Sequence, residues 1–368
     1  MTLHTGGPPV PTPDSLIVDA RTHTPLRALK VHHADATHRL WLKLEQENPT
    51  GSIKYRTALG LLAALSSRRP LYPGTQVVES TSGNLGLALA HLLARMDCQL
   101  IAIVDPKVPS SVQELMRAQG ATVHQVTDRD EHDGYLLTRL AKVAELTDAD
   151  PGLRWTDQYH NPAGPGVHRR TTAPELIEQT YGAIDAVLAA VSTGGTLAGV
   201  SEGLRAVSPC LRVIAVDVQG SLATGDRAQA HLLTGIGATR RSTLLRPDHH
   251  DRVARVFDVE AFACCRMLSE DTGLRIGGSG GAVLAAYLAN LHGDLRRARC
   301  PVAVIADGAD NYLATFYDDS WLAERGVADR VNAEIAKARA EGLSFEIADT
   351  AAGPTTDPLR PPARRMDQ

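Results

Sequence analysis

Short apolar blocks alternate along the chain with longer ones, and this alternation predicts strands and helices in turn. The shorter blocks, rich in Val, Ile and Leu, predict strands at residues 16–18, 40–45, 75–79, 99–104, 121–126, 186–191, 212–218, 253–259 and 302–306. The longer blocks predict helices at 58–65, 85–96, 112–119, 135–146, 196–206, 260–271, 282–291 and from about 321 to 342. Apolar strands that alternate with helices indicate an α/β fold whose mostly parallel sheets are covered by helices on both faces.

A polar turn, residues 48–56, interrupts this pattern between the 40–45 strand and the first buried helix. Asn48-Pro49 and Gly51 break the chain there, so Lys54 falls where a strand turns into a helix. An amine at that place has little access to water and lies near the positive end of the helix dipole, and both effects lower its pKa. A neutral amine can form a Schiff base, which makes Lys54 a candidate catalytic residue. On this stretch alone, a solvated lysine in a first helical turn is the alternative.

Composition narrows the class of protein. The 368 residues are enough for two domains, and 43% hydrophobic and 22% charged content is ordinary for a globular protein. A net charge of −4 without a basic block argues against nucleic acid as a partner, and no apolar run reaches membrane-spanning length. Five scattered cysteines and an N-terminus without signal-peptide features predict reduced thiols, a cytoplasmic setting and no metal site.

Three further polar loops follow predicted strands, and ligands of open parallel sheets bind at the carboxyl ends of strands. The first contains Ser80, Thr81, Ser82, Gly83 and Asn84. Its hydroxyls, amides and helix N-terminus suit a carboxylate, although a plain helix cap is the alternative. The second contains Ser192, Thr193, Gly194, Gly195 and Thr196. Its adjacent glycines and threonine hydroxyls suit a phosphate, and it matches neither the Walker nor the dinucleotide pattern.

The third loop, residues 277–281, surrounds Ser279 with glycines, a pattern that a tight turn with a serine cap would also give. A strand-to-helix lysine, a carboxylate loop and a phosphate loop together describe a site for an aldehyde cofactor that carries a phosphate and meets an amino acid. Pyridoxal 5′-phosphate is such a cofactor, so the sequence predicts that it is bound here and that the substrates are amino acids.

These motifs resemble those of the cysteine synthase and cystathionine β-synthase family of fold-type-II pyridoxal-phosphate enzymes, from about Thr24 to Trp321. Residues 48–56 resemble the family pattern Asn-Pro-x-x-Ser-x-Lys-x-Arg, which implies that Lys54 binds the cofactor covalently. The loop at 80–84 resembles the loop that binds the substrate carboxylate, with Asn84 also on the cofactor's 3′-oxygen. The loop at 192–196 resembles the cofactor-phosphate loop, where Ser192 stands in place of the usual glycine.

The resemblance also implies a reaction. Ser279 falls where the family places a hydroxyl opposite the pyridine nitrogen, and Gln158 falls in the active-site glutamine segment. A neutral serine cannot hold that nitrogen protonated as a carboxylate would, so the cofactor is a weaker electron sink. The implied reaction is β-replacement on an activated L-serine, in which loss of the β-substituent gives an aminoacrylate and a nucleophile adds to it.

The nucleophile is the open question. A turn that begins at Gly235, which the family places at the cleft entrance, is followed by Arg240 and Arg241, a pair that suits anionic reactants unless it is merely solvated. Residues 310–312 and 317–321 resemble the branch that joins O-phospho-L-serine to L-glutamate, giving N-(2-amino-2-carboxyethyl)-L-glutamate for the 2,3-diaminopropionate of siderophores and peptide antibiotics. The alternatives are a cysteine synthase that uses sulfide, another β-replacement enzyme, or a non-catalytic cofactor-binding relative.

The resemblance further implies a tryptophan synthase β-like arrangement of two domains and a homodimer. The large cofactor-binding domain is expected to span residues 14–45 and 156–322, and the small mobile substrate domain residues 46–155. Residues 1–13 are expected to be disordered, and residues 323–368 to form a C-terminal helix and a disordered tail, because both ends are rich in proline and polar residues.

Overall fold

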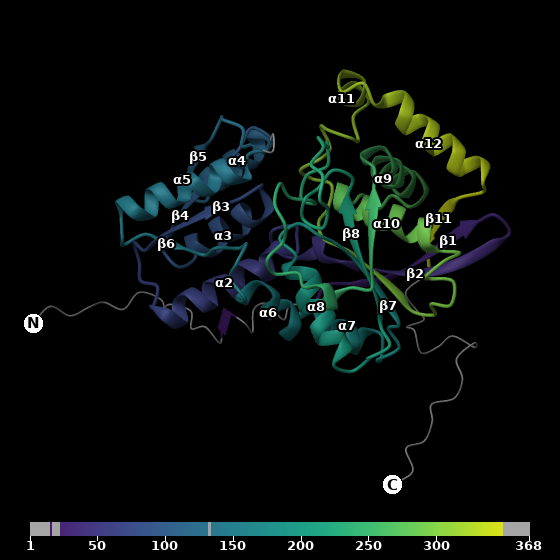
Figure 1. The fold of residues 1–368 in the computed structure, drawn as a ribbon, viewed down its shortest axis with the longest axis horizontal. Coiled ribbons are helices and arrows are strands. Elements are labelled where there is room, and N and C mark those ends of the chain that lie inside the picture. The colour runs from purple at the N-terminus through teal and green to yellow at the C-terminus, as the bar shows by residue number, and fades with distance from the viewer. Residues whose placement is uncertain (1–14, 17–22, 132–133, 349–368) are drawn as a thin grey trace, which may run out of the picture.

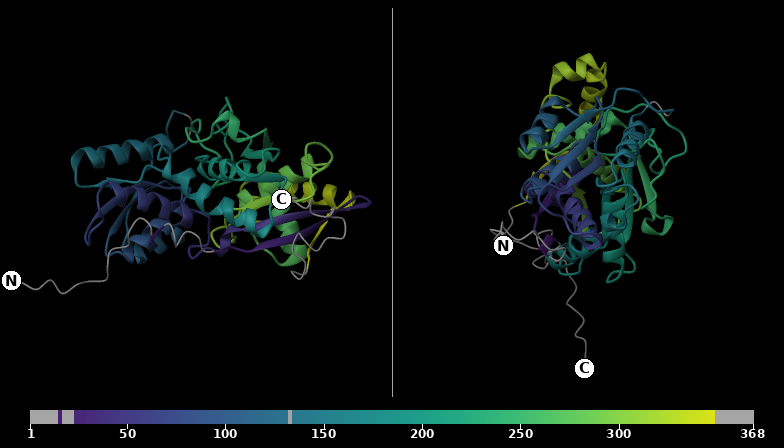
Figure 2. Two further views of the ribbon diagram at one scale, coloured as in Figure 1. Left: turned by 90° about the horizontal axis from the view of Figure 1, so that it is seen from below. Right: turned by 90° about the vertical axis from the view of Figure 1, so that its left-hand side faces the viewer.

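Two sheets organise the chain in the computed structural model, which describes residues 15–16, 23–131 and 134–348 (Figure 1). Disorder is predicted for 1–13 and for the tail after 348, which lie outside the described residues, and so does most of the strand predicted at 16–18. Figure 1 and the left-hand view of Figure 2 show the smaller sheet with its helices beside the larger one, so the chain forms two bodies.

The larger sheet has seven strands in the order β11-β1-β2-β10-β7-β8-β9. The strands are β1 (Leu26–His33), β2 (Ala36–Leu44), β7 (Ala186–Ala190), β8 (Arg212–Val218), β9 (Arg252–Val256), β10 (Pro301–Ile305) and β11 (Ser344–Ile347). From β2 to β9 neighbouring strands are parallel, whereas β1 is antiparallel to both β2 and β11. The parallel strands are apolar along nearly their whole length because helices cover both of their faces.

The smaller sheet has four parallel strands in the order β5-β4-β3-β6. They are β3 (Gln76–Ser80), β4 (Gln99–Val104), β5 (Thr122–Gln125) and β6 (Arg154–Trp155). Since all four come from residues 76–155, this sheet falls within the predicted small domain; the domain boundaries themselves stay a prediction.

Helices follow most strands and pack on the sheets. They are α2 (Lys54–Arg68), α3 (Asn84–Ala94), α4 (Ser110–Ala118), α5 (Leu136–Ala149), α6 (Ala163–Arg170), α7 (Thr172–Gln179), α8 (Gly195–Arg205), α9 (Asp258–Thr272), α10 (Gly278–Asn290), α11 (Asp319–Glu324) and α12 (Ala328–Ala340), with short 3-10 turns at Glu45–Glu47 and Pro247–His249. α10 is apolar all round because it is enclosed by α9 and by strands β7, β8 and β10. Within the described residues, no helix combines the length and apolar character needed to cross a bilayer.

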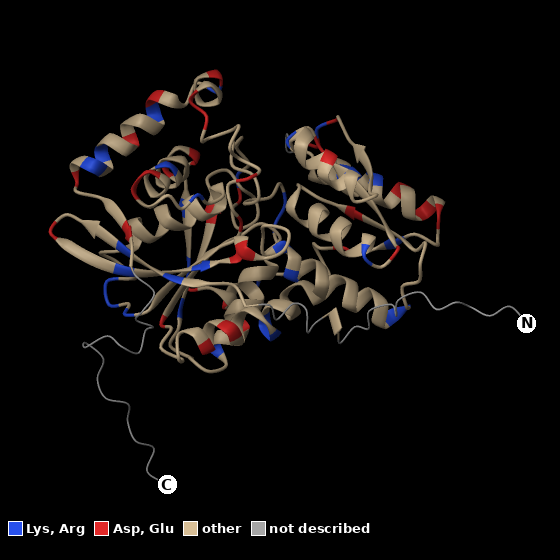
Figure 3. Ribbon diagram, turned by 180° about the vertical axis from the view of Figure 1, so that it is seen from behind, with Lys and Arg blue, Asp and Glu red and all other residues tan. Residues whose placement is uncertain are grey.

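The α/β fold predicted from the sequence is confirmed, but the edge of the larger sheet was not predicted. β1 and β11 were missed because each is a half-exposed edge strand whose apolar positions are interrupted by charged ones, such as the Lys30–Glu346 pair across the two strands at 2.7 Å. β11 brings part of the predicted C-terminal extension into the sheet, and α12 packs against α9. Figure 3 shows charges of both signs spread over the ribbon, as along α12.

Candidate active site

A cavity of about 700 Å³ opens between the two sheets, at the carboxyl ends of β3, β7 and β10. The predicted site residues that line it are Lys54, Ser82, Gly83, Asn84, Gln158, Ser192, Thr193, Gly194, Thr196, Gly235 and Ser279. The predicted site residues outside its lining are Ser80, Thr81, Gly195, Arg240 and Arg241. The strand-end loops singled out in the sequence therefore meet at one place, as expected for parallel sheets.

Lys54 is the first residue of α2, and the turn before it is tied to the larger sheet. Ile53 N donates to the carbonyl of Ala306, just after β10, at 2.8 Å. The Lys54 side chain is half-buried and faces the cavity. Loss of water around the amine lowers the pKa of Lys54, and the nearby Asp307 carboxylate opposes that shift. The predicted shift in pKa, towards a neutral and nucleophilic amine, is thus reproduced by the geometry.

Hydrogen bonds from side chains fix the shape of the loop at 80–84. Thr81 Oγ1 accepts hydrogen bonds from Gly83 N at 3.1 Å and from Gly86 N at 2.9 Å, so Thr81 supplies the cap of α3 from below the loop. The backbone of Gly83 has φ +127°, which favours glycine. The Gln158 side chain donates to the Ser80 carbonyl at 2.6 Å. Capping is therefore done by Thr81, and the exposed Ser82 is left facing the cavity.

The loop at 192–196 is a close-packed cradle at the start of α8. Gly194 has φ +84°, and a Cβ on it would come within 2.4 Å of Ser242 Oγ and 2.8 Å of Leu245 Cβ. Thr193 and Thr196 line the cavity beside the amino end of the helix. A phosphate fits this combination of hydroxyls, open backbone and helix N-terminus, so the residues present, with Lys54 on the same cavity lining, fit pyridoxal phosphate.

Sequence reasoning missed Asp307 and Arg139 in the same region. Asp307 lies just after β10 and lines the cavity together with Asn311 and Tyr312, which belong to the stretch 310–312 noted in the sequence. Arg139 of α5 is buried behind it, and its guanidinium is 3.2 Å from the Asp105 carboxylate. An acidic residue directly after the last strand was a signal for Asp307, whereas a single arginine in a helix gave none.

The two arginines singled out in the sequence lie beside the cavity rather than on its lining. Arg240 Nη2 donates to His160 Nε2 at 2.5 Å, and its guanidinium carbon is 6.0 Å from the centre of the Tyr159 ring. Arg241 is exposed and pairs with Asp226 at 2.6 Å. Their role as substrate ligands stays a prediction, and this geometry gives it no support.

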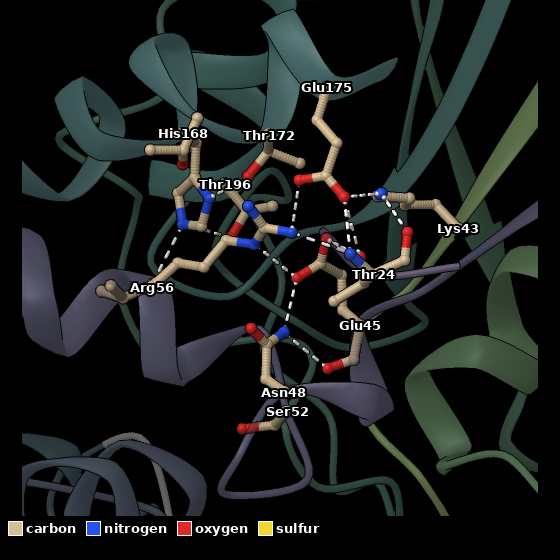
Figure 4. Close-up of polar contacts among 12 residues, drawn as sticks. Thr24, Lys43, Glu45, Asn48, Ser52, Arg56, His168, Thr172, Glu175 and Thr196 are labelled. Carbon is tan, nitrogen blue, oxygen red and sulfur yellow. Dashed lines mark hydrogen bonds and ion pairs between the residues drawn. The ribbon is translucent and has the colours of Figure 1, made fainter. Parts of the chain in front are cut away.

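Beneath Lys54, a cluster of buried charges joins α2 to the larger sheet (Figure 4). Arg56 Nε donates to Glu45 Oε2 at 2.9 Å, and Arg56 Nη2 lies 2.7 Å from Glu175 Oε2. Lys43 pairs with the same Glu175 and donates to the Thr24 carbonyl at 2.7 Å. Because all four charged side chains are buried and the charges balance, the cluster fixes the start of α2.

Another buried carboxylate, Glu79 of β3, supports the Gln158 segment. It accepts hydrogen bonds from Thr156 Oγ1 at 2.5 Å and from Gln158 N at 3.1 Å. Burial raises the pKa of Glu79 to about 7 in spite of these hydrogen bonds, from an ordinary value of 4.5. The folded protein therefore holds a proton on Glu79 between these two pH values, and the unfolded chain does not.

This difference in protonation predicts that Glu79 makes stability fall as the pH rises from about 4.5 to about 7. Its contribution is complete below pH 4.5 and is lost as the pH passes 7, with a total of about 3 kcal/mol. Glu79→Gln keeps the shape and removes the titration, so its urea midpoint is expected to depend less on pH over this range. Glu114→Gln, at an exposed position of α4, is the control; equal pH dependence in both variants contradicts the prediction.

Residues that could ligate a metal do not gather at the cavity, and no group of three or more His, Cys, Asp or Glu suited to a metal occurs in the part of the chain that the structure describes. The polar groups that line the cavity include amines, guanidiniums, hydroxyls, amides and backbone at helix starts. These groups suit an organic ligand with a phosphate and a carboxylate.

Known proteins resemble the chain in sequence and in fold. Residues 17–307 match the family described as pyridoxal-phosphate dependent enzyme. The N-(2-amino-2-carboxyethyl)-L-glutamate synthase of Ralstonia nicotianae is 37% identical over 322 residues, which cover 88% of this chain and 95% of that protein. The protein of the same name from Cupriavidus metallidurans is 36% identical over 310 residues, covering 83% and 91%. The crystal structure of an O-ureido-L-serine synthase has a TM-score of 0.73 at 27% identity and covers 83% of this chain and 98% of its own.

Proposed function

The chain belongs to the family of pyridoxal-phosphate dependent enzymes, and from this premise we propose that it joins O-phospho-L-serine to L-glutamate, giving N-(2-amino-2-carboxyethyl)-L-glutamate and phosphate. Membership of the family confirms the cofactor and the enzymatic nature that the sequence predicts. The names of two relatives with more than a third of their residues identical support the choice of product. Use of the product for 2,3-diaminopropionate, and assembly as a homodimer, stay predictions.

The observation that carries the proposal is the charge of the cavity lining. Three cationic side chains besides Lys54 line the cavity, Lys107, Arg129 and Arg325, whereas Asp307 is the single carboxylate among the described lining residues. A cleft lined by one sign of charge concentrates ligands of the opposite sign. Phosphoserine and glutamate both carry several negative charges, so both reactants suit this lining.

Two of these cations are held at opposite rims by aromatic rings. Arg129 follows β5 of the smaller sheet, and its guanidinium carbon lies 5.3 Å from the centre of the Tyr135 ring. Arg325 follows α11 on the other side, 5.5 Å from the centre of the Trp321 ring. Stacking on an aromatic face leaves the edge of the Arg325 guanidinium facing outward, where it suits carboxylate oxygens.

Arg139 supports a phosphate-bearing first substrate. Arg139 lies at a smaller hollow that shares Ser82, Tyr159 and Ser192 with the cavity lining. Its Nε is 3.2 Å from the Asp105 carboxylate, and its side chain also hydrogen-bonds Tyr159. A guanidinium held in this way beside the cavity adds positive charge that favours an anionic substrate.

Individual residues have separate roles in the proposed reaction. Pyridoxal phosphate held here would supply an electron sink for the amino acid. The Lys54 amine, whose pKa is lowered by loss of water around it, takes the proton from the α-carbon of the serine substrate. The start of α3 and Ser82 face the substrate carboxylate, and the cradle at Gly194 holds the cofactor phosphate.

Product analysis tests the proposal. Purified protein with cofactor is offered phosphoserine or acetylserine, each with glutamate, aspartate or sulfide, and products are identified by mass spectrometry together with released phosphate. Phosphoserine with glutamate is expected to give the fastest turnover. The sulfide-using alternative predicts cysteine as the main product, and the non-catalytic alternative predicts none.

Removal of one rim cation should affect the nucleophile. Arg325→Gln is expected to raise the KM for glutamate about ten-fold, because a charged hydrogen bond is worth at least about 1.4 kcal/mol, with a smaller effect on the KM for phosphoserine. Arg330→Gln, an exposed position of α12 outside the cavity lining, is the matched control. Equal glutamate KM values in the two variants would remove Arg325 from the binding site.

A further inference from the structure

One buried carboxylate on the cavity lining has no role in the predictions from sequence. Asp307 follows β10 and is 3% exposed. Its backbone is held on two sides: Ser52, next to the Lys54 turn, forms a β-bridge with it, and Gly277 N donates to its carbonyl at 3.0 Å. The carboxylate therefore has a fixed place between the start of α2 and the start of α10.

The carboxylate receives three side-chain donors. Oδ2 accepts from Asn84 Nδ2 at 2.8 Å and from the Tyr312 hydroxyl at 2.6 Å, while Oδ1 accepts from Ser279 Oγ at 3.3 Å. The orientation of the Asn84 amide is fixed a second time, because its Oδ1 accepts from Asn311 Nδ2 at 3.0 Å. Asn84 and Ser279 lie on different elements, α3 and α10, and Asp307 is the group that joins them.

The space around Asp307 independently indicates a fixed position. A Cβ on Gly277 would lie 2.0 Å from Asp307 Oδ1 and 2.6 Å from its Cγ. Gly277 has an ordinary extended backbone, so glycine is required there by the carboxylate and not by the turn. The side chain therefore cannot swing away without leaving a hole against Gly277.

We infer that Asp307 is a positioning residue for the cofactor. It fixes Asn84 and Ser279 relative to each other, and it accepts the hydrogen bond that the Ser279 hydroxyl donates. Ser279 has one proton to donate. While that proton points to an ionised Asp307, Ser279 turns a lone pair to the cavity and acts there as an acceptor. A serine without this neighbour would be free to donate into the cavity instead.

This inference changes the expected electronics of the site. The sequence argument treats Ser279 as an isolated neutral group, whereas the structure places an acidic group one hydrogen bond behind it. Burial raises the pKa of Asp307, and hydrogen bonds from Tyr312, Asn84 and Ser279 together with the Lys54 charge oppose that shift. The inference rests on the proposed cofactor site but not on the identity of the amino-acid substrates.

The test is Asp307→Asn, measured without any amino-acid substrate. The asparagine oxygen can keep the Asn84 and Tyr312 donors, while its amide then donates to Ser279 and forces the hydroxyl proton towards the cavity. The absorbance band of the bound cofactor is expected to shift, and the dissociation constant of the cofactor from the apo-protein to rise about ten-fold. Because neither measurement needs turnover, failure of the glutamate assignment leaves the result intact.

A double variant tests whether Asp307 acts through Ser279. If it does, Asp307→Asn leaves the absorbance band of the cofactor unmoved in protein that already carries Ser279→Ala. Tyr312→Phe removes one hydrogen-bond donor and makes the Asp307 carboxylate a stronger acceptor. The absorbance band is therefore expected to shift in the direction opposite to the shift in Asp307→Asn. This variant tests the inference even if Asp307→Asn fails to fold. An unmoved band in Tyr312→Phe, or an equal Asp307→Asn shift with and without Ser279, overturns the inference.

Discussion

Lys54→Ala is expected to lose covalently held cofactor and to reduce turnover by about a thousand-fold or more. The loss combines two roles of one amine, attachment of the cofactor and transfer of the substrate proton, and proton transfer alone contributes about 10²–10⁴-fold in enzymes. Lys54 is suited to both because the protein around it lowers the pKa of its amine while its side chain remains on the cavity lining. We therefore expect Lys54→Ala to lose more turnover than substitution of any other residue on the cavity lining.

Borohydride reduction followed by peptide mass spectrometry checks the attachment directly. The added mass is expected on the peptide that contains Lys54, and it is expected to be absent from Lys54→Ala. Lys142→Ala, at a surface position of α5 that pairs with Glu145, is the control and should retain both the added mass and the turnover. Cofactor mass on a different lysine of the wild-type protein would rule out the proposed role.

Local patterns in the sequence identified the parts of the site that are contiguous in the chain. The Lys54 turn and the loops around Ser82 and Gly194 were found because each ends a strand with small polar residues, and parallel topology brings such ends together. The parallel centre of the fold was found for a similar reason, since its strands are short apolar runs. These features depend on residues that are neighbours in sequence.

Features that depend on distant residues were not found. The sequence around Asp307 does not indicate that this residue joins Asn84 to Ser279, because the two contacts span 223 and 28 residues. The cationic rim was predicted but placed at Arg240 and Arg241, whereas the structure puts Arg129 and Arg325 on the lining. A charged side chain can be counted from sequence, but which way it faces is set by tertiary packing.

The second large effect is expected at Arg56, two residues after Lys54. Arg56 is fully buried and stands between Glu45 and Glu175, with Lys43 as the other cation of the cluster (Figure 4). Burial alone would lower the pKa of Arg56, but the two carboxylates outweigh it and raise that pKa, so the guanidinium stays charged. Its removal leaves two buried carboxylates with one cation.

Arg56→Met is therefore expected to lower the free energy of unfolding by about 3–5 kcal/mol, the usual cost of breaking a buried ion pair from one side. Arg252→Met, which removes an exposed arginine paired with Asp294 at 2.8 Å, is the control and should cost no more than about 1 kcal/mol. Urea unfolding followed by circular dichroism measures both.

A double variant separates charge from packing. If the unpaired carboxylate causes the loss, adding Glu45→Gln to Arg56→Met should recover part of the stability, although Glu45→Gln alone removes a partner and destabilises. The same variants should loosen the start of α2, because Asn48 Nδ2 also donates to Glu45 Oε2 at 2.7 Å and Lys54 lies between Asn48 and Arg56. Weaker cofactor retention in Arg56→Met is therefore expected alongside the lower unfolding midpoint. If Arg56→Met and Arg252→Met unfold at the same urea concentration, the cluster does not stabilise the site.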